Sequence, residues 1–195
     1  KGSGADKLWL NKKIELHSID IYASKTVDVI CDAHFFHLKK NFYNGVWIQA
    51  VLEHVVDPKK VVDEIYRVLK PGGIVYAETP FMQQVHEGAY DFTRYTVLGH
   101  RFLFKKFQLI DIGGNKGPEI AFAWSVKYLV WSLTRSQIFA KIIGNLITLL
   151  VSPLRFFLSK KSMYDASSGV FFLGRKVKNY LVTHKKLISL YKGQF

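Results

Sequence analysis

One segment, residues 45–79, constrains the fold more than any other because it holds two apolar runs joined by a helical pattern. Val46 to Val51 is apolar apart from Gln49, as expected for a strand covered on both faces. Ile74 to Thr79 has the composition of a second strand. Two strands joined through a helix form a parallel pair with a right-handed crossover. The sequence therefore predicts the α/β fold class.

The helix between these strands carries signals at both ends. Asp57 followed by Pro58 is typical of a helix start, because Asp is a favoured N-cap and proline at the first helical position has no N–H to satisfy. Pro71-Gly72-Gly73 ends the helix and supplies a residue for the positive φ of the turn. Five apolar residues recur on one stripe between the two signals: Val61, Val62, Ile65, Val68 and Leu69.

Length and composition set broad limits. The chain has 195 residues, which suits one domain or one domain with an appendage. Cys31 is the only cysteine, so no internal disulfide can form, as is common in the reducing cytoplasm. The first residues are polar with no long apolar run behind them, so we see no signal peptide and expect a cytoplasmic protein.

The order strand, loop, helix, glycine turn and strand, with Leu52-Glu53-His54 in the loop, resembles the C-terminal half of a class I S-adenosylmethionine-dependent methyltransferase. Residues 79–96, which include Tyr90-Asp-Phe-Thr-Arg-Tyr-Thr96, are similar to a segment of one bacterial, type 11-like subgroup of these enzymes. The resemblance implies a Rossmann-like, mostly parallel sheet whose last strand is antiparallel. It also implies S-adenosyl-L-methionine as the cofactor.

The start of the chain is unusual for such an enzyme. Lys1 is followed by Gly2-Ser-Gly4, which resembles the end of the glycine loop that follows the first strand in the family. We therefore expect an N-terminally truncated fragment that lacks this first strand.

The resemblance assigns cofactor-binding roles in the first part of the chain. It implies that Gly2 and Gly4 approach the cofactor through their backbone, that Asp20 holds the ribose hydroxyls and that Asp32 meets the adenine edge. The alternative is that both acids only end strands. A dinucleotide site fits less well, because its third glycine is replaced by Lys7.

Two further residues and one departure complete the cofactor prediction. The resemblance adds Gln49 and Leu52, at the end of the strand after Val46, to the cofactor site. Only residues 22–26 join the two strands that precede Asp32, too few for a crossover helix, so we expect a short or displaced strand there.

The loop after residue 79 contains the candidate catalytic and acceptor-binding residues. We select His86 as the general base, because its unperturbed pKa lies near neutral pH. Asp91 would orient His86 or replace it, and Arg94 would hold an anionic or sugar-like acceptor. The alternatives are that Asp91 and Arg94 pair to cap the next helix while His86 only packs, that His54 is the base, or that the enzyme uses no dedicated base.

The C-terminal part predicts a helical insert before the last strand. Phe107 to Ile112 and Val170 to Val177 read as strands, and Ile120 to Leu133 and Ile138 to Leu158 read as helices between them. The expected organisation is a methyltransferase core at 1–117, a helical insert or lid at 118–165, and the last strand with a basic tail at 166–195.

The net charge of +13 requires an acidic partner or a solvated surface. Residues 151–195 hold nine Lys or Arg, one Asp and no Glu, which suits peripheral contact with an anionic membrane at its inner face. The longest strongly apolar stretch, Ile142 to Val151, is shorter than the roughly 20 residues that a membrane span requires. For the insert itself we expect a lid over the acceptor site or a surface that rests on a bilayer. A buried insert with a solvated basic end is the simpler alternative.

Other partners have less support. No nucleic-acid-binding motif accompanies the positive charge, and the seven histidines are scattered without metal-ligand spacing, so we expect no metal. We therefore predict methyl transfer to an oxygen or nitrogen of a small or lipid- or sugar-linked acceptor. The rivals are a non-catalytic methyltransferase-like module and a basic nucleic-acid-binding protein.

Overall fold

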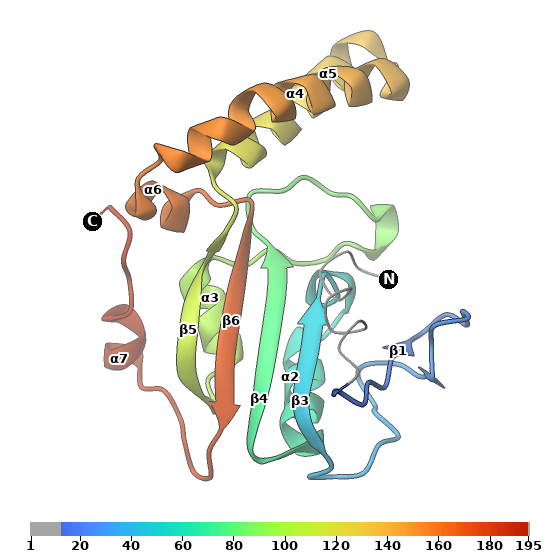
Figure 1. Ribbon diagram of the computed structural model, residues 1–195, viewed down its shortest axis with the longest axis vertical. Helices are drawn as coiled ribbons and strands as arrows, with labels where there is room; N and C mark the ends of the chain where they lie inside the picture. Colours follow the sequence, from blue (N-terminus) through green and yellow to red (C-terminus); the bar gives the residue numbers. More distant parts are fainter. Residues whose placement is uncertain (1–12, 195) are drawn as a thin grey trace.

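The computed structural model describes residues 13–194, and its centre is a four-stranded sheet in the order β3-β4-β6-β5 (Figure 1). Strands β3 and β4 are parallel, while β6 runs antiparallel to both of its neighbours. This arrangement confirms the predicted α/β class and the antiparallel last strand. The bounds are Tyr43–Gln49 for β3, Leu69–Pro80 for β4, Phe107–Asn115 for β5 and Gly169–Lys176 for β6.

Helix α2, Pro58–Val68, makes the crossover between β3 and β4 as predicted. The Asp57 carboxylate accepts a hydrogen bond from the backbone N–H of Lys60 at 3.0 Å, which caps the helix. Gly72 takes a φ of 81°, a conformation that favours glycine, but it lies near the start of β4, which begins at Leu69, rather than in a separate turn. Helices α2 and α3, Val97–Leu103, cover the same face of the sheet (Figure 1).

The core lies between the sheet and these two helices. Phe104 stacks on Phe172 at 4.7 Å between ring centroids, and both side chains are fully buried. The buried Arg101 guanidinium donates to the carbonyl oxygens of Phe104 and Phe107. His100 is also fully buried, and burial lowers its pKa to about 3, so the ring is neutral at pH 7.

Two short strands form a separate parallel pair: β1, Ile19–Asp20, and β2, Val29–Ile30. No helix joins them, and β2 is short, as expected for the strand that precedes Asp32. Within residues 13–194, neither strand is hydrogen-bonded to the four-stranded sheet. Gly2 and Gly4 lie outside the described residues. The loss of a strand before them therefore stays a prediction.

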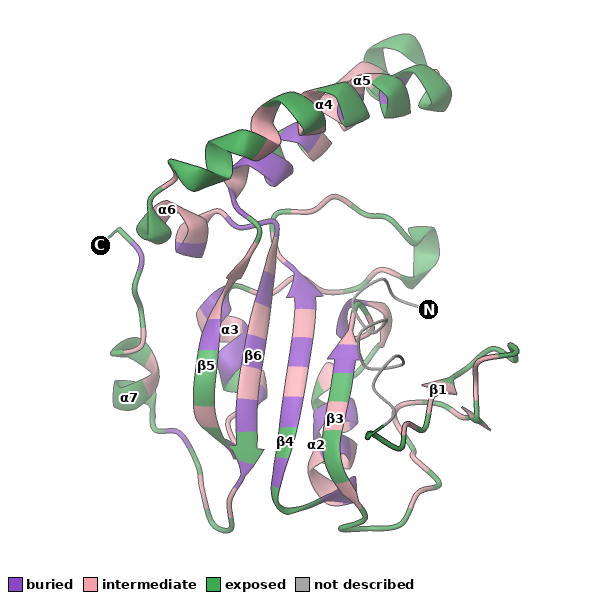
Figure 2. Cartoon of the chain, viewed as in Figure 1, coloured by how far each residue is buried: buried purple, intermediate pink, exposed green. Residues whose placement is uncertain are grey.

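The predicted helical insert lies between β5 and β6. Helices α4, Pro118–Thr134, and α5, Gln137–Val151, form an antiparallel hairpin that projects beyond the carboxyl ends of β3 and β4 (Figure 1). Most of this hairpin is exposed, whereas β4 and β6 are largely buried (Figure 2). The remaining helical segments are η1, Leu52–His54; η2, Gly88–Tyr90; η3, Ser152–Phe156; α6, Lys160–Asp165; and α7, His184–Ile188.

The structure corrects the prediction that no apolar segment is long enough to span a membrane. Helix α5 continues into η3, and together they form a 20-residue helical stretch, Gln137–Phe156. By length and composition alone, this stretch is long and apolar enough to cross a membrane. Only 11% of the apolar window in this stretch is buried inside the protein. Pro153 follows the apolar stretch and would be expected to end a helix. It lies in the first turn of η3, however, where proline does not interrupt the helical path.

Candidate active site

An open cleft of about 190 Å³ lies at the carboxyl ends of β3 and β4. Ligands of open α/β sheets bind at this end of the strands. The end of β3 contributes Gln49, the following η1 contributes Glu53, and the loop after β4 contributes His86. Trp124 of α4 closes one side, so the helical insert forms part of the wall.

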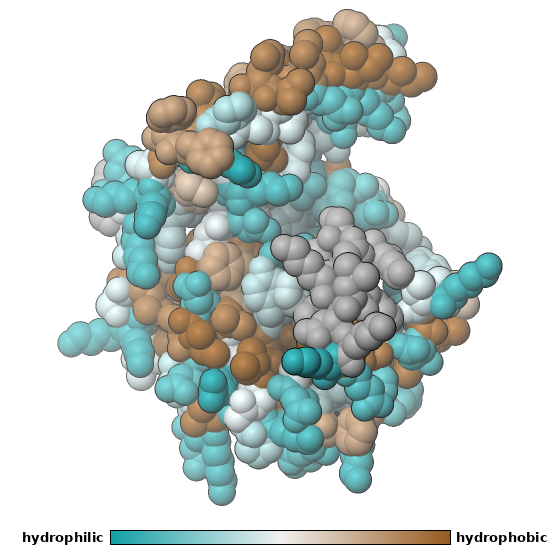
Figure 3. Space-filling model, in the orientation of Figure 1, coloured by the Kyte–Doolittle hydropathy of each residue, from teal (hydrophilic) through white to brown (hydrophobic). Residues whose placement is uncertain are grey.

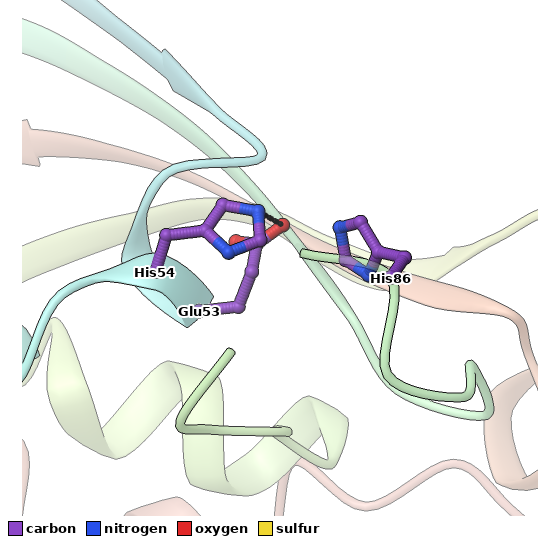
Figure 4. Close-up of side chains that lie close together, drawn as sticks. All are labelled: Glu53, His54 and His86. Carbon is purple, nitrogen blue, oxygen red and sulfur yellow. Dashed lines mark ion pairs between the residues drawn. The ribbon is translucent and has the colours of Figure 1, made fainter. Parts of the chain in front are cut away.

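Glu53 and His54 meet at the start of η1. The Glu53 side chain is only 1% exposed, and burial raises the pKa of its carboxyl group. His54 Nδ1 lies 2.7 Å from the carbonyl oxygen of Tyr90, so Nδ1 carries the proton and donates. His54 Nε2 then faces Glu53 Oε1 at 3.6 Å (Figure 4), an ion-pair distance that is longer than a hydrogen bond.

His86 is held by Asp91 from the same loop. His86 Nδ1 lies 3.2 Å from Asp91 Oδ2, and the His86 backbone N–H donates to that same oxygen at 2.9 Å. The ion pair with Arg94 holds the pKa of Asp91 well below its ordinary range, so Asp91 is a fixed anion. An anion at Nδ1 places the proton there and leaves His86 Nε2 as a proton acceptor.

Arg94 does not have the role that the sequence suggested. Its five N–H groups make five hydrogen bonds within the loop: to the carbonyl oxygens of Gln83, Gln84 and Thr93, and two to Asp91. A guanidinium has only five donors, so none remains for an acceptor. The structure instead shows the Asp91–Arg94 pair, although Thr96 rather than Asp91 caps α3. The prediction of Arg94 as an acceptor clamp is wrong.

Folding brings Glu53, His54 and His86 together, which no spacing in the sequence indicated. The His54 and His86 rings are edge-on with centroids 4.9 Å apart, and one ligand atom from each of the three residues lies within 4.8 Å of the others (Figure 4). Two metal–ligand bonds of about 2.1 Å span at most about 4.2 Å, so a zinc-like ion requires the side chains to close in. Direct proton transfer among them also requires a closer approach, because it takes place over about 2.6–3.2 Å.

The two acids assigned to the cofactor lie at the carboxyl ends of β1 and β2. Asp20 is exposed, and its Oδ1 accepts from the backbone N–H of Tyr22 at 3.0 Å. Asp32 is also exposed, and its Oδ1 pairs with the ring and the backbone N–H of His34, which lower the Asp32 pKa. Both carboxylates face solvent, as contact with a ligand requires, but Asp32 is partly engaged by His34.

The other two cofactor residues have different outcomes. Gln49 lines the cleft and donates through Nε2 to Glu78 Oε2 at 2.7 Å. Leu52 is fully buried in the core, so its side chain does not face the cleft, and its assignment to the cofactor site stays a prediction. Glu78, which sequence reasoning missed, lines the cleft beside Gln49. Its signal was an acid near the carboxyl end of the second apolar run.

Comparison with known proteins agrees with this geometry. Residues 9–77 match the model of a family described as "Methyltransferase domain". This third of the chain is therefore similar in sequence to a methyltransferase domain. A ubiquinone biosynthesis O-methyltransferase from Pectobacterium atrosepticum is 38% identical over 58 residues, which are 30% of this chain and 22% of that relative. The matched region thus spans about a fifth of the relative's length.

Two solved structures share the fold of this chain. The [4+2]-cyclase SpnF superimposes with a TM-score of 0.55 at 14% identity, covering 90% of this chain and 71% of that one. Phosphoethanolamine N-methyltransferase 2 of Haemonchus contortus, in complex with S-adenosylhomocysteine, gives 0.53 at 19% identity, covering 91% and 47%. At these identities the similarity establishes the fold alone.

Proposed function

We propose that the protein transfers a methyl group from S-adenosyl-L-methionine to an oxygen or nitrogen of a small or lipid- or sugar-linked acceptor. One observation carries the proposal: Asp91 fixes His86 so that a basic nitrogen is available at the cleft beyond β3 and β4. The domain family and the relative named as an O-methyltransferase support the same reaction class.

The described residues fit the proposed cofactor. The exposed carboxylates of Asp20 and Asp32 suit hydroxyl and amine groups of an adenosine, and Gln49 presents an amide at the cleft. When bound, S-adenosylmethionine supplies a methyl group activated by a sulfonium. Gln49 ends β3 and lines the same cleft as His86, whereas Asp20 and Asp32 are not among the residues that line it. The methyl group and the acceptor would therefore meet near the end of β3.

The chain's own part in the reaction is proton removal and alignment. When the acceptor oxygen or nitrogen takes the methyl group and the C–S bond breaks to leave a neutral thioether, His86 Nε2 would accept the proton that the acceptor atom loses. Asp91 stabilises the resulting imidazolium, and Arg94 holds Asp91 by charge and by two hydrogen bonds. Glu53 and His54 lie beside His86 at this end of the cleft.

The test is a radiolabelled methyl-transfer assay against a panel of phenol, sugar, amine and lipid-extract acceptors. Replacing His86 with Ala should lower the rate by about 10²–10⁴, the usual contribution of a general base. Asp91→Asn should also lower it, while His184→Ala on the distant α7 serves as the matched control. A chelator should leave the rate unchanged if Glu53, His54 and His86 move protons rather than hold a metal. Full activity in both the His86 and Asp91 variants would refute the catalytic assignment.

A second candidate is a cofactor-binding protein that does not transfer methyl groups. The favouring observation is that the fold is shared with a protein named as a [4+2]-cyclase, and fold does not determine reaction. Binding of S-adenosylhomocysteine without turnover on any acceptor would favour this candidate.

A further inference from the structure

The α4–α5 hairpin exposes an apolar stripe that the rest of the chain leaves uncovered. On α5 the exposed apolar residues recur every three or four positions along one face: Ile138, Ile142, Leu146, Leu149 and Leu150. Leu129 and Leu133 are exposed apolar residues of α4, and Phe156 and Phe157 are exposed at the end of η3. Figure 3 shows hydrophobic residues gathered along the visible side of this hairpin. Contiguous surfaces of this kind mark contact with a membrane or a partner.

The charges of the same region favour an anionic membrane. Residues 120–164 contain six Lys or Arg and no Asp or Glu. Arg135 lies at the hairpin turn, Lys141 lies on α5, and Arg155, Lys160 and Lys161 follow it, all five exposed. Cations beside an apolar, aromatic-rich helix face are the composition of helices that lie in the headgroup region of a bilayer.

The topology favours lying on the bilayer over spanning it. β5 and β6 pair in one sheet, and the hairpin connects them, so α5 alone cannot cross a membrane. Both helices would have to enter together, but α4 carries Lys127 in its middle. Its inner side is also occupied, because Gln84 donates to Ser125 and Tyr128 donates to the carbonyl oxygen of Val85.

These α4 contacts also place the hairpin beside the candidate active site. Gln84 and Val85 immediately precede His86, and Trp124 of α4 lines the cleft. A bilayer under the hairpin would therefore lie near the cleft mouth.

We propose that the α4–α5 hairpin docks on the surface of an anionic lipid bilayer through its apolar stripe and flanking cations. Of the two regions that the sequence offered for membrane contact, the insert and residues 151–195, the proposal selects the insert. The described part of that segment is divided: Arg155, Lys160 and Lys161 adjoin the hairpin, whereas Lys185 and Lys186 lie on α7, which packs beside α3.

The test is co-sedimentation of the full chain with vesicles of phosphatidylcholine alone or with 30% phosphatidylglycerol. We expect binding to the anionic vesicles, weakened by about tenfold or more when Arg135 and Lys141 are both replaced by Glu. Replacing Ile138 and Leu149 by Ser should weaken it similarly by removing apolar contact. Lys185→Glu with Lys186→Glu is the matched charge control on α7 and should bind as the unmodified chain does.

Each other outcome overturns the proposal. Equal binding to neutral and anionic vesicles would show that the cations do not contribute. Loss of vesicle binding in the α7 variant alone would show that the contact lies in the C-terminal region. Absence of vesicle binding by a folded chain, with a dimer that the Ile138 and Leu149 substitutions convert to monomer, identifies a second copy as the occupant. Because all substituted side chains are exposed, unchanged urea unfolding midpoints verify that the variants fold.

Discussion

The sheet with α2 and α3, and the α4–α5 hairpin, use similar apolar residues in opposite ways. In the first region Leu69, Ile65 and Phe172 are fully buried against one another, whereas in the second Leu149 and Ile138 are more than 70% exposed (Figure 2). The first region is therefore stabilised by burying its apolar surface within the chain. The second retains apolar surface that only another molecule can cover.

The largest expected difference comes from one substitution made in both regions. Leu69→Ala should lower the free energy of unfolding by about 2–5 kcal/mol, because it removes buried contacts and leaves a cavity. Leu149→Ala, at 71% exposure, should change it by no more than about 0.5 kcal/mol. Urea unfolding of both variants measures the difference. Comparable losses would show that the hairpin stripe is packed in solution.

The free energy of unfolding should depend on pH through the buried side chain of His100 in the core. His100 has a pKa of about 3 when folded, below its ordinary value of 6.5, so the unfolded chain binds this proton first. Its stabilising contribution is complete above pH 6.5 and declines as the pH falls from 6.5 towards 3. Between pH 7.5 and pH 5 this costs about 2 kcal/mol.

The matched variant isolates that contribution. Urea unfolding at the two pH values should show a smaller pH dependence for His100→Leu than for the unmodified chain, by the same margin. His184→Leu, at an exposed position on α7, should leave the pH dependence as it is. An unchanged slope in His100→Leu would mean that the buried ring does not govern acid sensitivity.

The smallest expected effect compares two helix caps. Asp57→Ala removes the cap of α2 and should lower global stability by about 1 kcal/mol. Ser136→Ala removes the cap of α5, where it accepts from the Phe139 N–H, and should speed amide exchange only within the hairpin. Hydrogen exchange with urea unfolding separates the two. If Ser136→Ala lowers global stability as much, the hairpin and the sheet unfold as one unit.

The sequence predicted best where signals are local. The cap, the proline and the glycine turn around α2 lie within a few residues of the boundaries they set, and the helix begins and ends close to them. The exposure of the hairpin could not be predicted in this way. Periodicity identifies an apolar face, but whether another element covers it depends on the whole fold.

In the candidate site, too, contacts within one loop could be predicted, whereas contacts between distant segments could not. His86 and Asp91 share one short loop, so their pairing could be inferred from spacing. Glu53 meets His86 only after the sheet forms, so their proximity could not. Arg94 was misread because the partners that occupy it are mainly backbone carbonyl oxygens, which no side-chain pattern reveals.

The central claim is that the strand ends of this domain bind the adenosine part of S-adenosylmethionine. Isothermal titration of S-adenosylhomocysteine into the chain tests it most directly, with Asp20→Ala as the site variant. Glu15→Ala, which removes a nearby exposed carboxylate, is the control. We expect binding by the unmodified chain, retained in Glu15→Ala and weakened about tenfold or more in Asp20→Ala. No heat of binding from a chain that unfolds cooperatively in urea, or equal affinity in Asp20→Ala, would contradict the account.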